Sequence, residues 1–247
     1  MQEQFLRNEM LWGEEGQRRL AEAHVILFGL GGVGSYTAEC LARAGIGELT
    51  LVDGDEVSVS NLNRQLEALH STVGRPKVEV VAERIRDINP AAVLHPIHGI
   101  YNAEHRDRFF PADCSYDYII DAIDLVSCKL DLAETARRLH IPLIMALGTG
   151  NKLDASLLRV TDIAETSGCP LARVMRKELR KRGILHQKVV FSPEKAAPTV
   201  QQEAPPPGRR SVPASTPWVP AVAGLLLGGA VVMDLVQNQT VEGADGQ

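Results

Sequence analysis

The sequence predicts an α/β fold in which a mostly parallel sheet is covered by helices on both faces. Three observations predict it. Short apolar, β-branched runs alternate with amphipathic helical patterns over the first 150 residues. A glycine-rich turn separates the first apolar run from the first helical pattern. The 247 residues, of which 45% are hydrophobic and 23% charged, suffice to bury the core of one large domain.

The first strand–helix–strand unit runs from residue 24 to residue 53. "HVILFGL" (24–30) and "ELTLVD" (48–53) are short apolar runs typical of buried strands. Small and apolar residues recur at helical spacing between them, and Gly45 can end that helix. Because strands that alternate with helices pair in parallel, this unit begins a mostly parallel sheet.

The same alternation continues to residue 148 and then becomes looser. A helix is predicted within 74–90, where Asn89 and Pro90 stop it. Pro96 favours an edge position for the strand that follows. The later expected elements are a strand at 92–100, a short helix at 103–110, a strand at 116–124, a helix at 126–140, a strand at 141–148, a strand at 157–163, a helix at 169–183 and a strand at 187–192.

We expect residues 1–247 to form a single domain. A nucleotide-binding core would occupy residues 20–150, and residues 151–236 would extend it with C-terminal strands and helices. The proline- and alanine-rich stretch 194–217 is predicted to be a flexible loop, and residues 237–247 a frayed tail. The apolar run 218–236 is near the lower limit for a membrane span, and its many small residues favour a buried or interfacial helix.

Composition narrows the location and the partners. The net charge is −5, so the chain as a whole is not a nucleic-acid binder, although local basic patches remain possible. The N-terminal residues have mixed charge and no apolar core, so they are not a signal peptide. The four cysteines lack C-x-x-C spacing, which argues against a zinc knuckle or disulfide framework and favours the reducing cytoplasm: Cys40, Cys114, Cys128 and Cys169.

The glycine-rich turn predicts a nucleotide site. It has the G-x-G-x-x-G pattern of a Rossmann-like fold, between a strand and a helix. The first glycine permits a tight turn, the middle ones let backbone approach a phosphate, and the last permits close helix packing. Backbone N–H groups at the helix start would then face an anion. The glycines of this site are Gly29, Gly31, Gly32 and Gly34.

Polar residues further along the chain indicate what is done with the nucleotide. Asp53 ends the second strand, where an acid can bind ribose hydroxyls, as also occurs in NAD enzymes. Two cations, Arg64 and Lys77, suit negative charge that develops on phosphate, whereas hydride transfer does not need them. Asp124 follows a strand end and can hold Mg²⁺. The other polar candidates in this region are Asp55, Asn61, Asn63 and Gln65.

Several other residues keep two interpretations. Asp121 can point into the core or cap the turn after its strand. Lys129 can add a cation to the site or lie on a helix surface. His95 and His98 are three residues apart on a predicted strand, so they point to opposite faces and we expect them to be structural.

Five motifs in this order resemble the E1-like activating enzymes, the superfamily of ThiF, MoeB and HesA proteins. They are the glycine turn, Asp53-x-Asp55, "SNLNRQ", "GRPKV" and "DAID". The resemblance implies ATP-dependent adenylation of a carboxylate with release of pyrophosphate. It implies that Asp53 binds the ribose, that Asn61, Arg64 and Lys77 bind phosphates and that Asp124 holds Mg²⁺. Arg7 matches an arginine that the family sends into the partner's site of a homodimer.

Further features resemble the tRNA threonylcarbamoyladenosine dehydratase branch of that superfamily. The zinc-binding C-x-x-C pairs of carrier-protein enzymes are missing, and "GTGNKLD", "CPLARVMRKELRKRGI" and "VPAVAG" match the branch. The implied substrate is the threonylcarbamoyl carboxylate on adenosine 37 of tRNA, which cyclises to a hydantoin after adenylation. The resemblance also implies a cysteine-desulfurase or sulfur-acceptor system as a possible partner. It implies no obligatory membrane contact. "VPAS" departs from the Pro-Gly-Ser turn expected in the branch.

Two features of the C-terminal part have alternative interpretations. Ring closure is intramolecular, so Cys169 need not be catalytic; it is a packing residue or a thiol near substrate. A basic stripe on the predicted helix 169–183 either contacts tRNA phosphates or is a solvated face: Arg173, Arg176, Lys177 and Arg180. The alternative functions are adenylation of a ubiquitin-like sulfur-carrier C-terminus and NAD-dependent oxidation.

Overall fold

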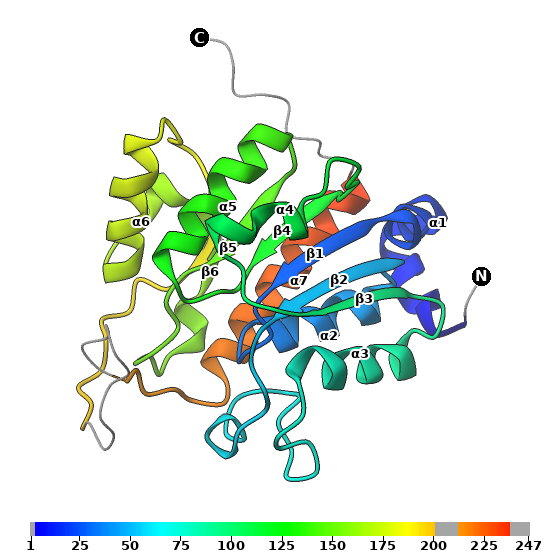
Figure 1. The fold of residues 1–247 in the computed structure, drawn as a ribbon, viewed down its shortest axis with the longest axis horizontal. Coiled ribbons are helices and arrows are strands. Elements are labelled where there is room, and N and C mark those ends of the chain that lie inside the picture. Colours follow the sequence, from blue (N-terminus) through cyan, green and yellow to red (C-terminus); the bar gives the residue numbers. More distant parts are fainter. Residues whose placement is uncertain (1–2, 201–211, 238–247) are drawn as a thin grey trace.

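The computed structural model describes residues 3–200 and 212–237, which form a seven-stranded sheet with helices on both faces (Figure 1). Every strand pair is parallel except the last, in which β6 runs antiparallel to β7. The predicted α/β class is therefore confirmed. In sheet order the strands are β3 (Val93–His98), β2 (Glu48–Asp53), β1 (His24–Phe28), β4 (Tyr118–Asp121), β5 (Leu143–Ala146), β7 (Lys188–Phe191) and β6 (Arg159–Asp162).

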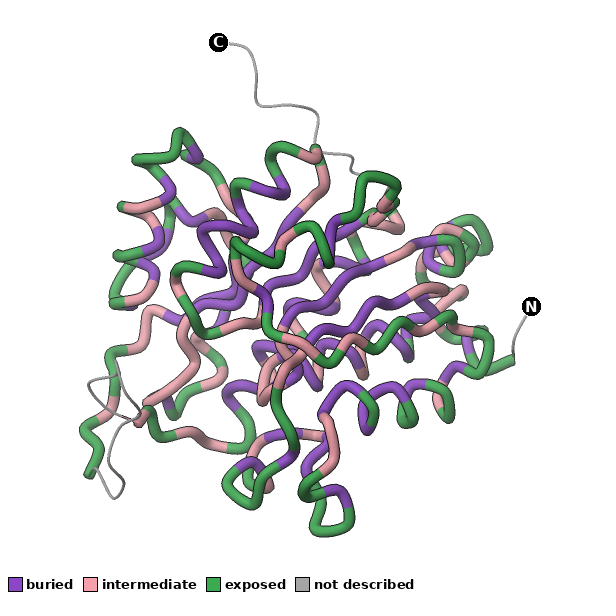
Figure 2. Tube along the Cα trace, in the orientation of Figure 1, coloured by how far each residue is buried: buried purple, intermediate pink, exposed green. Residues whose placement is uncertain are grey.

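The helices divide into two layers around the buried sheet (Figure 2). One layer contains α1 (Leu6–Glu22), α2 (Gly34–Ala44), α3 (Lys77–Ile88) and α7 (Val219–Gln237). The other contains α4 (Arg106–Phe109), α5 (Val126–Leu139) and α6 (Pro170–Lys181). Short 3₁₀ helices occupy Glu3–Phe5, Val59–Asn61, Ala103–His105, Ala155–Leu157 and Ile163–Glu165.

Local sequence signals fix several element ends. Gly45 ends α2 with a left-handed φ of 93°, and its N–H donates to carbonyls of the last turn. Pro76 precedes the first residue of α3, where a missing N–H costs no helical hydrogen bond. Asn89 and Pro90 stop α3, as predicted, and β3 lies at the sheet edge, as Pro96 indicated.

Helix α1 was not predicted from the sequence. It is rich in charges that pair with one another, such as Arg18 with Glu15 and Glu22. The structure buries only Gly16 and Leu20 of its side facing the core. Gly13, with φ of 76°, interrupts the helix and breaks the periodicity further. A helix with only two buried residues offers few core positions from which it could be recognised in the sequence.

Among residues 3–200 and 212–237, α7 is the only helix long and apolar enough to cross a bilayer. It packs inside this protein against α2 and α1 and on β5, which agrees with the prediction of a buried helix. Its glycines permit this close packing. A Cβ on Gly224 would lie 2.2 Å from the carbonyl oxygen of Val33 in the turn before α2.

The described residues of the predicted flexible loop 194–217 are anchored to another part of the chain. Residues 194–200 and 212–217 form no helix or strand. The backbone N–H of Ala197 donates to the carbonyl of Asn151 at 2.7 Å, so one end of the loop is held against the preceding segment. The rest of this prediction, residues 201–211, and residues 238–247 of the predicted tail lie outside the described residues.

Two neighbouring glycines of α7 give a matched test of its packing. A Cβ on Gly228 would lie 2.7 Å from Cβ of Cys40 in α2, whereas one on Gly229 would meet no atom within 4 Å. We expect Gly228→Ala to lower the free energy of unfolding by roughly 1–3 kcal/mol through overpacking. Gly229→Ala should leave it unchanged or raise it by up to about 1 kcal/mol through helix propensity. Urea unfolding midpoints measure both, and equal effects would contradict the buried position of this face.

Candidate functional site

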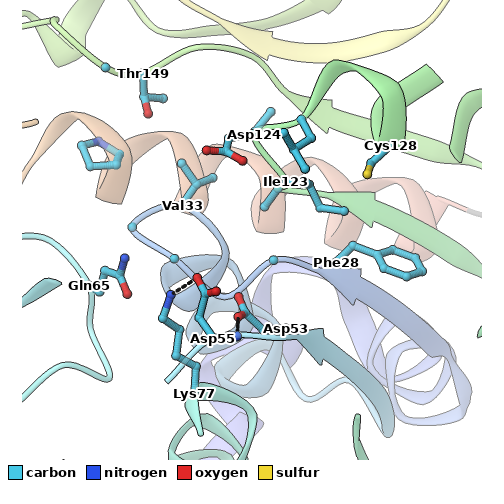
Figure 3. Close-up of a pocket in the computed structure, with 18 of the residues that line it drawn as sticks. Phe28, Val33, Asp53, Asp55, Gln65, Lys77, Ile123, Asp124, Cys128 and Thr149 are labelled. Carbon is cyan, nitrogen blue, oxygen red and sulfur yellow. Dashed lines mark hydrogen bonds and ion pairs between the residues drawn. The ribbon is translucent and has the colours of Figure 1, made fainter. Parts of the chain in front are cut away.

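A cavity of about 760 Å³ opens at the carboxyl ends of β1, β2, β4 and β5. Strand order reverses between β1 and β4, which is where open α/β sheets bind ligands. Its size is in the usual range for small-molecule sites. Ten predicted residues line it (Figure 3 labels some): Gly29, Gly31, Gly32, Asp53, Asp55, Asn61, Arg64, Gln65, Lys77 and Asp124.

The glycine turn forms the floor of the cavity. Only glycine fits at the two ends of this turn, Gly29 and Gly34. Gly29 has φ of 87°, and a Cβ there would lie 2.8 Å from the carbonyl oxygen of Ala122. A Cβ on Gly34 would lie 1.8 Å from the carbonyl oxygen of Gly29. Gly34 is buried at the first position of α2, so the helix begins directly at the turn and its positive end faces the cavity.

Asp53 shapes the turn from the end of β2. One carboxylate oxygen accepts a hydrogen bond from the N–H of Leu30 at 2.6 Å, and the other accepts from the N–H of Asp55 at 2.8 Å. Each carboxylate oxygen has a further lone pair. Asp53 therefore fixes the backbone around the cavity while it still offers acceptors to a ligand.

The predicted cation Lys77 lies at the first position of α3, paired with an acid. Its ammonium is 3.0 Å from Oδ2 of Asp55. The Lys77 side chain is only 5% exposed, whereas that of Asp55 is 72% exposed. An ammonium has three donors, so this ion pair orients Lys77 and leaves it able to bind an anion.

The polar loop that carries Asn61 and Arg64 is held by its own hydrogen bonds. Oδ1 of Asn61 accepts from the N–H of Ser58 at 3.0 Å and caps a short 3₁₀ helix. Nη1 of Arg64 donates to the carbonyl of Ser60 and to Oδ1 of Asn63. Such a loop presents its guanidinium and amide groups to the cavity in a fixed arrangement.

Asp121 and Lys129 form a buried ion pair beneath the cavity. Both side chains are 0% exposed, with Nζ of Lys129 3.0 Å from Oδ2 of Asp121 and 2.6 Å from the carbonyl oxygen of Ala146. Burial raises the pKa of Asp121, and the adjacent ammonium opposes that shift. Lys129 is thus neither a cavity cation nor a surface residue. Asp121 both points into the core and accepts from the N–H of Ile123.

Asp124 lies three residues after Asp121, is exposed and lines the cavity. Figure 3 shows it on one side of the glycine turn and the Asp55–Lys77 pair on the other. Asp124, Arg64 and Lys77 thus line one cavity with the glycine turn, and such a set of groups can hold a metal–phosphate group.

The wall of the cavity that lies across from the glycine turn and the polar loop was not predicted from the sequence. It is formed by residues 148–150 and 213–215, the second of which lies in the "VPAS" segment. Asn151 joins these segments, because its N–H and Oδ1 bond the carbonyl and the N–H of Ala214 at 2.8 and 2.7 Å. Nδ2 of Asn63 donates to the carbonyl of Ser215 at 3.1 Å. The glycines of "GTGNKLD" were the available signal for a close approach here.

Two other acidic or thiol groups near the cavity were not predicted. Glu67 is 2% exposed behind the polar loop, and burial raises its pKa to about 7 against the opposing effects of Lys77 and Ser35. Cys128 lines the cavity, where its thiol donates to the carbonyl of Tyr101 and burial raises its pKa. A thiol with a raised pKa is a weak nucleophile. Cys169 is buried at the start of α6, in agreement with a packing role.

The remaining predicted residues lie away from the cavity. Arg7 is exposed on α1 and does not line the cavity of its own chain. On α6, Arg173, Lys177 and Arg180 are exposed. Arg176 is different, because its guanidinium turns back and donates to the carbonyl and hydroxyl of Thr166. The basic stripe is therefore reduced to three exposed residues.

Comparisons with known proteins agree with this arrangement. A model of the ThiF family matches residues 5–237. The tRNA threonylcarbamoyladenosine dehydratase of Bacillus subtilis is 42% identical over 249 residues, 96% of each chain. The Escherichia coli protein of that name is 41% identical over 192 residues, 74% of this chain and 71% of that one.

A solved structure extends the likeness to the whole fold. The crystal structure of Escherichia coli tRNA threonylcarbamoyladenosine dehydratase in complex with ATP superposes with a TM-score of 0.84 at 35% identity. The match covers 97% of this chain and 96% of that chain. The NAD-dependent oxidoreductase considered from the glycine turn alone is not supported, because the match extends through all the motifs that follow it. The chain belongs to the ThiF family.

Proposed function

We propose that this chain is an ATP-dependent tRNA threonylcarbamoyladenosine dehydratase. It would adenylate the threonylcarbamoyl carboxylate on adenosine 37 of tRNA and then close that group to its hydantoin form. The observation that carries the proposal is the cavity in which Arg64, Lys77 and Asp124 meet the glycine turn. The family relatives of the same name, similar over nearly the whole chain, support the choice of substrate.

The chemistry assigns a task to each side of the cavity. ATP would lie on the glycine turn, with its ribose against Asp53 and Asp55 and its phosphates toward Asn61, Arg64, Gln65 and Lys77. The substrate carboxylate attacks the α-phosphorus, and pyrophosphate leaves. Arg64 and Lys77 stabilise the negative charge that develops on the phosphate oxygens and on the leaving group.

Ring closure follows without an enzyme nucleophile. A nitrogen of the threonylcarbamoyl group attacks the activated carbonyl carbon, loses its proton and expels AMP, so that the net change is loss of one water. Because the nitrogen and the carbonyl belong to one group, proximity supplies the effective concentration. The packed thiol of Cys169 and the raised pKa of Cys128 agree with a step that needs no thiolate.

Asp124 is the residue we propose to hold Mg²⁺. Its exposed carboxylate offers the oxygen ligands that Mg²⁺ prefers, beside the anion-binding turn. The bound ion would neutralise charge on the phosphates during transfer.

The rest of the chain would serve the tRNA and a second subunit. We propose one domain in which residues 151–236 complete the substrate side of the core at 20–150, and a homodimer in which Arg7 completes the partner's site. Four free cysteines and a tRNA substrate fit the cytoplasm. The sulfur-transfer partner stays a prediction.

Removal of the proposed metal ligand, Asp124, or of the proposed phosphate ligand, Arg64, tests the site. We expect Asp124→Asn and Arg64→Ala each to lower the rate of hydantoin formation about 100-fold or more, the usual cost of removing one transition-state contact. Mass spectrometry of nucleosides from threonylcarbamoylated tRNA detects the product as one water lighter. The control is Asp87→Asn, which removes an exposed carboxylate on α3 outside the cavity.

Two outcomes would contradict this assignment. If Asp124→Asn and Arg64→Ala both kept full turnover, the cavity would not be the reaction site. If the wild-type protein left tRNA unchanged but consumed ATP with a ubiquitin-like carrier protein, the alternative function would hold.

The proposed role of Arg7 is testable by mixing two inactive variants. Arg7→Ala lacks the residue sent to the partner, and Lys77→Ala lacks a residue of its own cavity. Each alone should be inactive. After subunit exchange at equal concentrations, about one quarter of the sites would combine intact Lys77 with intact Arg7 from the partner. Activity in the mixture that does not exceed the sum of the separate variants would overturn the shared site.

The exposed bases of α6 are expected to contact tRNA phosphates. Arg173→Ala and Lys177→Ala should each weaken tRNA binding and reduce the slope of log affinity against log salt by about 1. Fluorescence anisotropy at salt concentrations of about 50–200 mM measures both effects. Lys181→Ala on the same helix is the control, because Lys181 is already paired with Glu178. If all three variants kept the wild-type slope and affinity, this face would be assigned to solvent alone.

A further inference from the structure

Two histidines and a glutamate gather at the amino ends of β1, β2 and β3, at the end of the sheet opposite the cavity (Figure 1). His24 and Glu48 are the first residues of β1 and β2 and face each other in the parallel register. His95 of β3 faces Thr50, two residues after Glu48. Because side chains alternate along a strand, this register places all three on one face of the sheet.

The ligand atoms of this group are near the spacing that one metal ion needs. Nδ1 of His24 lies 3.4 Å and Nε2 of His95 lies 2.7 Å from Oε1 of Glu48, and all three atoms are within 4.8 Å of one another. Around tetrahedral Zn²⁺, with bonds of about 2.0–2.1 Å, ligand atoms are ~3.3 Å apart. The imidazole rings are 5.6 Å apart between centroids, close to the ~5 Å that a shared zinc ion imposes.

The surroundings hold His24 in the orientation that a metal ligand requires. Its Nε2 lies within hydrogen-bond distance of Oγ1 of Thr50, at 2.9 Å, and its Nδ1 faces Glu48. Oδ2 of Asp117 accepts a hydrogen bond from the backbone N–H of His24 at 2.7 Å, and the ring of Tyr116 packs edge-on against the imidazole. Hydrogen bonds of this kind to the second ring nitrogen orient histidine ligands in metal sites.

The entry path is also present. The side chain of His24 is 15% exposed, but those of Glu48 and His95 are 37% and 46% exposed. A hydrated ion can therefore reach the cluster, and small rotations of the two more exposed side chains adjust the distances. His98, which the sequence places three residues from His95, lies on the other face and bonds the carbonyl of Gly54 instead.

We propose that His24, Glu48 and His95 bind one Zn²⁺ ion, with water in the fourth position. Two imidazoles and a carboxylate form an established donor set for zinc. The ion would tie the edge strand β3, through β2, to β1 in the centre of the sheet. This inference does not depend on the proposed function, because none of the three residues lines the cavity.

Zinc titration of the chelator-stripped full chain tests the proposal. We expect calorimetry to show one equivalent of Zn²⁺ bound, and Co²⁺ in its place to give the visible absorption of a tetrahedral site. Zn²⁺ at about 100 times its Kd should raise the Tm by about 5–10 °C. His95→Ala and Glu48→Gln should each weaken binding at least about tenfold, a loss of ~1.4 kcal/mol or more.

Matched variants separate this site from others. His98→Ala removes an exposed histidine of the same strand and should leave zinc affinity unchanged, as should Asp124→Asn in the cavity. Absence of stoichiometric binding to the wild-type chain would overturn the proposal. It would also be overturned if His95→Ala kept the wild-type affinity, or if Asp124→Asn rather than His95→Ala abolished binding.

Discussion

The turn after β1 and the turn after β4 lie closer together than side chains would permit, and the site depends on that contact. A Cβ on Gly29 would fall 2.8 Å from the carbonyl oxygen of Ala122, and one on Gly34 would fall 1.8 Å from that of Gly29. Backbone therefore packs on backbone at the point where the strand order reverses. The same approach starts α2 at the cavity floor and directs its positive end toward a bound anion.

A buried ion pair stabilises the other half of this contact. Asp121 ends β4 and Lys129 reaches it from α5, while the same ammonium bonds the carbonyl of Ala146 at the end of β5. Removing one partner of such a pair costs roughly 3–5 kcal/mol, because the other is left charged and buried. The pair therefore fixes the ends of two strands, and Asp124, three residues on, extends from a rigid base into the cavity.

The sequence was sufficient for the elements and residues that local rules determine. The glycine turn, the end of α2 at Gly45 and the start of α3 after Pro76 follow from backbone conformation alone. Contacts between distant segments were not predictable. Nothing local indicates that Lys129 finds a buried acid or that Arg176 turns back to Thr166. Helix α1 was missed because most of its residues are polar or charged and only a narrow side of it is buried.

The same division separates the two halves of the site. The nucleotide half is made of motifs that lie within short stretches, so it can be predicted from the chain. The wall opposite is assembled from residues 148–150 and 213–215, which Asn151, at a left-handed φ of 58°, joins by bonding both backbone groups of Ala214. Asn63 links that wall to the polar loop. A change of substrate can therefore arise in this wall without disturbing the turn that holds the nucleotide, and specificity is to be sought there.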